Sequence, residues 1–462
     1  MMIGHAKQWG FPLYLTPLET FMWLDDRPAY PMTFLIHMEF SGTVDRAAFE
    51  AALGETLARH PLLSAFVQRA KRNRPCWVLA EGAMPRLDWA DESTPIECPQ
   101  GEAIDIGSQI GLRIWVRQGE DTARVLFQFH HACVDGTGAY RFLGDLLAAY
   151  GQRTAPDGKR PEPGPVDPKL LRTRKYGIMD LALRGKPLSV GWAAVRQAAR
   201  VLGRRASPLR APHSPWKHNG RLAAFPAIES YRFDEAEYKQ LRLAAVESGV
   251  TVNDLLLSEL FHAVREWNSR GGGGRLWSRG GRRRRIGIMM PTDLRDGDHY
   301  EMPAANMTSY TFLVRRAGAC ERADELLRSI RDETARIKNQ RLGTRFVDML
   351  AAALHVRGLL RVALSGRRCL STAVLSNVGD PTRRFTARLP RNKGRVVAGN
   401  LVLEQITGVP PLRPKTRAAI IIITYRRQLT VSMRCDPYLF RPEDTREQLA
   451  IYVDRLRRAA GL

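Results

Sequence analysis

The chain has 462 residues, of which 44% are hydrophobic and 26% are charged. This composition is typical of a soluble protein with a large apolar core, and it excludes a disordered chain, a collagen and a disulfide-held miniprotein. The length predicts about three domains, or two large lobes. The best apolar run, Ala418–Ile423, has the length of one buried strand, so we expect no membrane-spanning helix.

The N-terminal residues and the cysteines indicate a cytoplasmic protein. Residues 1–15 lack an uninterrupted apolar core followed by a small-residue cleavage site, so we expect no secretory signal. The six cysteines are scattered without CxxC spacing. We therefore expect neither a zinc site nor a disulfide framework.

The positive charge is concentrated in two segments. The net charge is +24, from 71 lysines and arginines against 47 acidic residues. Residues 151–225 hold 16 basic and 4 acidic residues, and residues 270–285 hold seven arginines and no acid. A nucleic-acid-binding fold more often spreads basic side chains over one helix or sheet face, so we expect no nucleic-acid partner. The arginine run Arg282–Arg285 is expected to lie in a solvated loop.

Residues 1–150 are predicted to form an N-terminal α/β lobe. Apolar and alternating patterns predict strands at residues 33–40, 62–67, 112–117 and 124–130, and helices at residues 44–60 and 136–150. Pro61 is expected to end the first of these helices.

Residues 151–225 are predicted to be a basic, proline-rich connector between two lobes. Five prolines between residues 156 and 168 exclude regular structure there. A basic helix is predicted at residues 189–202, with an aliphatic stripe beside Arg196 and Arg200. Such a helix suits contact with an anionic membrane surface, or docking of an acidic carrier protein or a nucleotide, although its basic face is equally compatible with simple solvation.

Residues 226–462 are predicted to form a C-terminal lobe. Helical periodicity is found at residues 234–248, 252–267, 321–338, 346–364 and 442–458. Strand patterns are found at residues 286–291, 309–314, 373–376, 401–406, 418–425 and 429–434.

The chemically informative stretch is FQFHHACVDG, residues 127–136. It ends an apolar strand, turns at Asp135-Gly136 and enters a helix. Adjacent side chains of a strand point to opposite faces, so only one of His130 and His131 can face a cleft while the other packs inward. Imidazole is a natural general base near neutral pH.

Residues His130–Gly136 resemble the HHxxxDG signature of an acyltransferase superfamily. It includes chloramphenicol acetyltransferase, nonribosomal peptide condensation domains, wax ester synthase/diacylglycerol acyltransferases and polyketide-associated acyltransferases. Five further segments resemble family elements in the same order: Pro17–Glu19, Arg59–Leu63 ("RHPxL"), Thr251–Leu257, Pro291–Arg295 ("PxxLR") and Leu375–Gly379 ("SNxG"). The departures are Glu19, where wax ester synthases usually have Asp, Ala305-Asn306 in place of "GN", and a missing DFGWG segment.

The resemblance implies a two-lobed α/β fold like chloramphenicol acetyltransferase, a pseudo-dimer with a tunnel along the seam. It implies that His131 takes the proton from an acceptor hydroxyl or amine as that atom attacks an acyl thioester, with no covalent acyl-enzyme. No bound cofactor or metal is implied, and acyl-CoA or an acyl-phosphopantetheine carrier would be a substrate.

The resemblance also implies a set of positioning residues. These are His130, Asp135, Gly136, Arg295 and Asn377. In this scheme, Asp135 pairs with an arginine, for which Arg295 is the candidate, and holds the loop that aims His131. Asn377 would approach the tunnel from the other lobe.

The residue types alone leave other roles open. His131 could be a packed strand-end histidine, and Cys133 beside it a nucleophile, although a buried thiol is the expected role. Asn377 could form a turn before a glycine, and Arg295 could be an ordinary surface arginine. A metal site made of the two histidines and Asp135 would lack further ligands at suitable spacing.

Three functions follow as hypotheses. The first is an O-acyltransferase that moves an acyl group from acyl-CoA to the hydroxyl of a small or lipid-like acceptor, in the cytoplasm or peripherally at a membrane. The second is a free-standing condensation-type domain that forms an amide or ester from a carrier-bound thioester. The third is a basic nucleic-acid- or membrane-binding protein on an inactive acyltransferase scaffold, against which the intact His131 and Asp135 argue. We expect the first, because the elements align more closely with wax ester synthases and no adenylation or carrier domain is present in the sequence.

Overall fold

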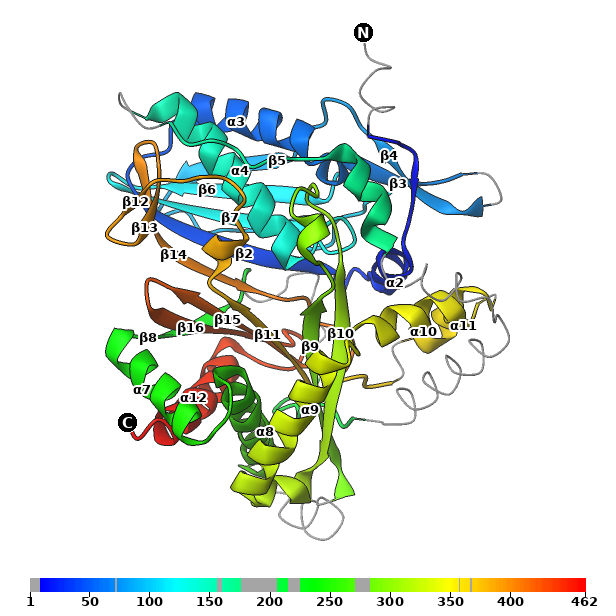
Figure 1. Ribbon diagram of the computed structural model, residues 1–462, viewed down its shortest axis with the longest axis vertical. Helices are drawn as coiled ribbons and strands as arrows, with labels where there is room; N and C mark the ends of the chain where they lie inside the picture. The colour runs from blue at the N-terminus through cyan, green and yellow to red at the C-terminus, as the bar shows by residue number, and fades with distance from the viewer. Residues whose placement is uncertain are drawn as a thin grey trace. The chain divides into compact units, whose positions relative to one another are not determined.

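A computed structural model describes residues 9–70, 73–155, 160–175, 206–214, 225–270, 283–356, 358–365 and 368–462. The chain divides into two compact units. Unit 1 consists of Met1–Met179, Asp293–Thr308 and Val378–Gly408, and unit 2 of Asp180–Thr292, Ser309–Asn377 and Val409–Leu462. Each unit combines a mixed sheet with helices, so the predicted α/β class is confirmed (Figure 1).

Unit 1 is built on a seven-stranded sheet in the order β12-β13-β14-β2-β7-β6-β5. Its strands are β2 (Thr33–Ser41), β5 (Arg86–Asp91), β6 (Leu112–Gln118), β7 (Thr122–His130), β12 (Arg391–Asn392), β13 (Arg395–Ala398) and β14 (Leu401–Val409). Strands β2 and β7 are antiparallel, with Thr33 opposite His130. Helices α3 (Arg46–Arg59) and α4 (Gly136–Thr154) lie side by side over one face of this sheet (Figure 1). The pairing of β2 with β7 extends to His130, the last residue of β7, and His131 follows directly.

A smaller sheet and a short helix complete unit 1. The sheet has the order β1-β4-β3, with β1 (Leu13–Tyr14), β3 (Ala65–Arg69) and β4 (Pro75–Leu79). Helix α2 (Pro17–Asp25) begins with a capping box, in which Thr16 and Glu19 satisfy each other's backbone N–H groups. The 3₁₀ segment η3 (Pro168–Lys175) belongs to the region predicted as a connector.

Unit 2 is built on a six-stranded sheet in the order β10-β9-β11-β15-β16-β8. Its strands are β8 (Glu229–Phe233), β9 (Arg285–Asp293), β10 (Thr308–Arg316), β11 (Ala373–Gly379), β15 (Ala418–Tyr425) and β16 (Gln428–Cys435). Its helices are α7 (Glu235–Glu247), α8 (Val252–Arg270), α9 (Ala323–Asn339), α10 (Thr344–Leu354), α11 (Leu359–Ala363) and α12 (Pro442–Ala459). Helices α7, α8 and α12 pack together along the sheet, with α9 beside α8 (Figure 1).

The core of unit 2 forms because the strands and helices present matching apolar faces. Ile420 and Ile422 alternate on β15, and Leu260 and Leu456 come from α8 and α12. All four are fully buried in one cluster, and each such side chain stabilises the fold by about 1.5–3 kcal/mol.

The predicted lobe boundaries differ from the compact units. The predicted lobes are contiguous segments with boundaries at residues 150 and 225, whereas residues 293–308 and 378–408 pack with unit 1. The reason is strand pairing: β14 lies next to β2 in the seven-stranded sheet and carries β12 and β13 with it. A pairing between strands so distant in sequence leaves no mark on local periodicity.

Two predicted elements also differ. The helix predicted at residues 346–364 is two helices, α10 and α11, separated by Gly358, whose φ of 80° is left-handed. The strand predicted at residues 62–67 begins as a 3₁₀ turn, Pro61–Ser64. The predicted basic helix at residues 189–202, with Arg196 and Arg200, lies outside the described residues. Among the described residues, no helix is long and apolar enough to cross a membrane.

Candidate active site

His130 packs inward at the end of β7. Its side chain is fully buried. The ring Nδ1 accepts a hydrogen bond from the backbone N–H of Ala132 at 3.1 Å, so the ring proton lies on Nε2. Nε2 faces Oδ2 of Asp26 at 3.6 Å. This is the arrangement expected of the structural member of the pair.

His131 is partly exposed, and both its backbone and its ring have a fixed contact. Its N–H donates to the carbonyl of Met32 at 2.7 Å, and its ring packs against Phe34 with a centroid separation of 5.0 Å. Burial of the ring lowers the pKa of His131 to about 4, although the charge of Asp135 and the nearby backbone oxygens act in the opposite direction. The imidazole is therefore neutral at pH 7 and able to accept a proton. Nδ1 is buried, which leaves Nε2 as the nitrogen for this purpose.

Asp135 joins three parts of unit 1. Its Oδ1 accepts from the N–H of Gly138 at 2.8 Å and so caps helix α4. Its Oδ2 accepts from Nη1 of Arg295 at 2.8 Å and from the N–H of Met307 at 2.7 Å. The carboxylate is thus engaged in holding the loop after His131, and the contact expected between Asp135 and Arg295 is present.

Arg295 is a largely buried cation, with its side chain 10% exposed, and it has two carboxylate neighbours. Burial alone would lower its pKa, but Asp135 and Asp293 together raise the pKa above its ordinary value. Its Nη1 lies 3.1 Å from Oδ1 of Asp293, and its Nη2 donates to the carbonyl of Ala305 at 2.8 Å. Arg295 is therefore a structural cation of unit 1 rather than an ordinary surface arginine.

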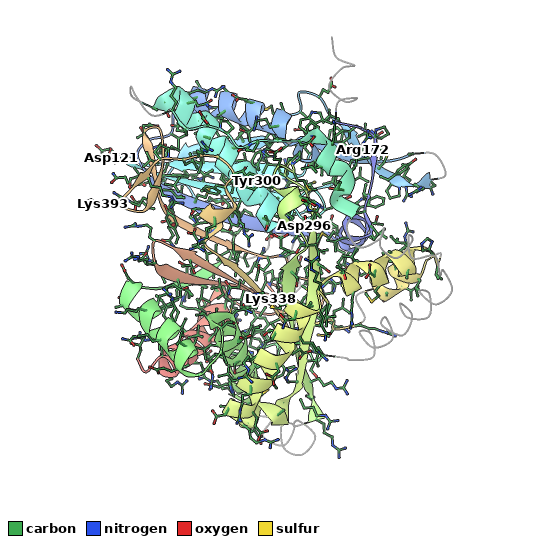
Figure 2. All side chains as sticks on the ribbon, in the orientation of Figure 1. Asp121, Arg172, Asp296, Tyr300, Lys338 and Lys393 are labelled. Carbon is green, nitrogen blue, oxygen red and sulfur yellow. The ribbon has the colours of Figure 1, made fainter. Side chains whose placement is uncertain are left out.

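Asn306 was not among the predicted site residues, yet it contacts the backbone of His131. Its Nδ2 donates to the carbonyl of His131 at 2.5 Å, and its side chain is buried. The neighbouring Ala305 carbonyl accepts from the N–H of Asp135 at 3.3 Å. A signal was present in the sequence, because Ala305-Asn306 keeps the Asn of the expected "GN". This segment follows Asp296 and Tyr300, which are labelled in Figure 2.

The "RHPxL" element also contacts the segment that contains Ala304 and Asn306. Nδ1 of His60 accepts from the N–H of Ala304 at 2.8 Å, and its Nε2 lies 3.2 Å from Oδ2 of Asp145. Both side chains are fully buried, and burial lowers the pKa of His60. Arg59 adds a second contact to Asp145 at 3.2 Å. A histidine that accepts on Nδ1 and donates from Nε2 is neutral. His60 therefore has a structural role, in which it links the backbone of Ala304 to Asp145.

The remaining predicted residues are placed as follows. Cys133 is fully buried, and burial raises the pKa of its thiol far above the ordinary value, which suits a packed thiol rather than a nucleophile. Gly136 is the first residue of α4. Asn377 lies on β11 of unit 2, where its Nδ2 donates to Oδ1 of Asn253 at 3.1 Å, and its approach to His131 stays a prediction. In the described part of the chain, no group of three His, Cys, Asp or Glu residues is placed to hold a metal ion.

Comparison with known proteins identifies the fold. No family model and no curated protein sequence matches the chain. Among solved structures, the first condensation domain of the calcium-dependent antibiotic synthetase, in complex with a substrate analogue, matches with a TM-score of 0.67 and 15% identity over 98% of this chain and 96% of that chain. The chain has the condensation-domain fold.

Two further structures share the condensation-domain fold. The starter condensation domain of rhizomide synthetase matches with a TM-score of 0.63 and 13% identity over 100% of this chain and 97% of that chain. Polyketide synthase associated protein 5 from Mycobacterium tuberculosis matches with a TM-score of 0.62 and 15% identity over 97% of this chain and 98% of that chain. The fold predicted from the HHxxxDG resemblance is confirmed. At these identities the comparison shows the fold, and the activity must be argued from the residues.

Proposed function

We propose that this protein is an acyltransferase that moves an acyl group from a thioester to a hydroxyl acceptor, with His131 as the general base. The observation that carries the proposal is the state of His131, a partly exposed residue with a neutral imidazole. Its backbone is held by Met32 and Asn306. The loop that follows it is held by Asp135 and Arg295. A base of this kind contributes by being positioned before the reaction starts.

The proposed step needs only this base and the two substrates. Nε2 of His131 accepts the proton of the acceptor hydroxyl while the oxygen attacks the thioester carbonyl. The carbon–oxygen bond forms, the carbon–sulfur bond breaks, and the proton passes from His131 to the departing thiolate. An acyl-enzyme on Cys133 is disfavoured, because burial keeps that thiol protonated.

For the donor we propose acyl-CoA, and the alternative is a carrier-bound thioester in a condensation-type reaction. The rhizomide starter domain, a protein of the same fold, was solved in complex with C8-CoA and Leu-SNAC, which supports a thioester donor. A tunnel at the lobe seam and Asn377 at its wall are part of this proposal. We further propose a cytoplasmic location with peripheral contact to anionic membranes through residues 151–225, whose net charge is +12.

The test is release of free thiol from acyl-CoA in the presence of hydroxyl acceptors. We expect His131→Ala to lower turnover by about 10²–10⁴-fold with little change in melting temperature, as for loss of a general base. His355→Ala, at an exposed position of unit 2, is the matched control and should retain turnover. Near-normal turnover in folded His131→Ala would refute the mechanism, and turnover only with a carrier-bound donor would favour the alternative.

A further inference from the structure

A cavity lined by arginines lies in unit 2. Its lining residues come from one end of β9, the neighbouring end of β10 and helix α9, elements that are labelled in Figure 1. Its volume is about 560 Å³, within the usual range for small-molecule sites. The charged residues that line it are Arg285, Arg315, Arg316, Asp332, Glu333 and Arg336. The sequence predicts a solvated loop for the run ending at Arg285, whereas Arg285 begins β9 and is only partly exposed.

The two acidic residues of the cavity are already engaged by arginines. Arg315 Nη1 lies 2.7 Å from Oε2 of Glu333, and its other nitrogens bond to Ser329. Oδ1 of Asp332 lies 2.9 Å from Arg331, a residue outside the cavity lining. Both carboxylates thus have a close cationic partner.

The other arginines of the lining have no carboxylate closer than 3.9 Å in the part of the chain that the structure describes. In the described part of the chain, Arg285 and Arg316 have no carboxylate within ion-pair distance, and Arg336 reaches Glu333 only at 3.9 Å. With four arginines against two acids, the lining carries a net charge of +2. Arg285, Arg316 and Arg336 therefore line one concave site without a close carboxylate partner.

We propose that this cavity binds a small soluble molecule through a diphosphate group, with Arg285, Arg316 and Arg336 as its ligands. The guanidinium group is planar and donates two parallel hydrogen bonds, which matches phosphate oxygens. A diphosphate supplies enough charge and acceptor oxygens for three such groups. A flat anionic surface fits less well, because Asp332 and Glu333 lie among the arginines and would repel it. All of its lining residues belong to unit 2, and none of them takes part in the proposed acyl transfer.

The experiment is isothermal titration of the full chain with inorganic pyrophosphate at low ionic strength. The test variant is Arg316→Gln/Arg336→Gln, which keeps polar side chains and removes two charges. We expect it to weaken pyrophosphate binding by about 10- to 100-fold, because hydrogen bonds between charged groups are lost. The control Arg242→Gln/Arg361→Gln removes the same charge from exposed positions of unit 2 and should change the dissociation constant by less than about twofold.

Each other outcome would overturn the proposal. Absence of pyrophosphate binding by the wild type refutes it, and so does equal weakening in the control variant, which would indicate general attraction to a basic protein. Binding only to vesicles that contain phosphatidylserine would assign the arginines to a lipid headgroup instead. Melting curves verify that both variants fold, and Arg316→Glu alone provides a second variant with a larger expected loss.

Discussion

The carboxylate of Asp135 accepts hydrogen bonds from Gly138, Arg295 and Met307, which lie far apart in the sequence. Asp135→Asn keeps the shape and can still cap α4, but it removes the charge that faces Arg295. We expect a loss of about 3–5 kcal/mol in the free energy of unfolding, as when one partner of a buried pair is removed. Acyl transfer should fall with it, because the loop after His131 loses its support. Urea unfolding and a thiol-release assay measure the two effects.

The matched control for this prediction is Asp293→Asn. Asp293 also contacts Arg295, at 3.1 Å, but its side chain is 28% exposed, against 4% for Asp135. Water screens such a contact, so we expect a cost of about 0–1 kcal/mol. Equal losses in the two variants would contradict the central role given to Asp135.

Helix α4 approaches the segment 304–307 so closely that Gly138 has no room for a side chain. A Cβ at this position would lie 2.6 Å from the carbonyl oxygen of Ala305 and 2.7 Å from Val134. Gly138→Ala should therefore destabilise the protein and lower turnover, although alanine in a helix is favoured over glycine by about 1 kcal/mol. Gly54→Ala in α3, where a Cβ meets nothing within 4 Å, should instead stabilise the fold by about 0.5–1 kcal/mol. Thermal unfolding of both variants tests the sign, and a stabilised Gly138→Ala would disprove the close approach.

The 3₁₀ segment η3 is fastened to α2 by a buried ion pair. Oε1 of Glu19 lies 2.8 Å from Nε of Arg174, and Oε2 accepts from Thr16 N–H at 2.8 Å and from Trp77 Nε1 at 3.1 Å. Glu19→Gln keeps the shape and leaves Arg174 buried without a counter-charge. We expect a loss of about 3–5 kcal/mol in urea unfolding.

The same substitution at an exposed pair is the control for Glu19→Gln. Glu55 lies 2.8 Å from Arg153, and both side chains are well exposed. Glu55→Gln should cost less than about 1 kcal/mol. A similar small loss for Glu19→Gln would mean that the buried pair does not hold η3 in place.

Over the whole molecule, histidines whose pKa is lowered by burial contribute to the response to acid. Burial lowers the pKa of His37, His131 and His262 to about 4 each, against 6.5 in the unfolded chain. Between these values the unfolded state binds more protons than the native state, so the free energy of unfolding rises with pH from about 4 to 6.5 and then levels off. We expect the melting temperature to fall as the pH is lowered from 6.5 to 4.

Measurements at high salt distinguish the effect of the lowered histidine pKa values from repulsion among the positive charges of the chain. Protonation also adds to a net charge of +24, and the resulting repulsion is screened by salt, whereas the pKa difference of buried groups is largely not. The fall in melting temperature should therefore persist at high salt and become shallower in His262→Gln. A melting temperature independent of pH in this range would contradict the prediction.

Local patterns in the sequence were sufficient for most individual elements. The predicted strand at residues 124–130 and helix at residues 136–150 correspond to β7 and α4, because alternation and helical periodicity depend only on near neighbours. The HHxxxDG motif located both histidines and Asp135. Arg295 was found only through the resemblance to a known family, since no local pattern links residues 160 positions apart.

The tertiary structure alone decided which distant segments meet. Strand β14 joins the sheet of unit 1 beside β2, and segment 304–307 reaches the backbone of His131 through Asn306. His60 accepts from the backbone of Ala304, a contact whose donor carries no sequence signature. Likewise, the arginine cavity of unit 2 combines Arg285 with Arg316 and Arg336 from other elements. Such contacts are set by backbone groups and by chain crossings, and the residue types at either end do not encode them locally.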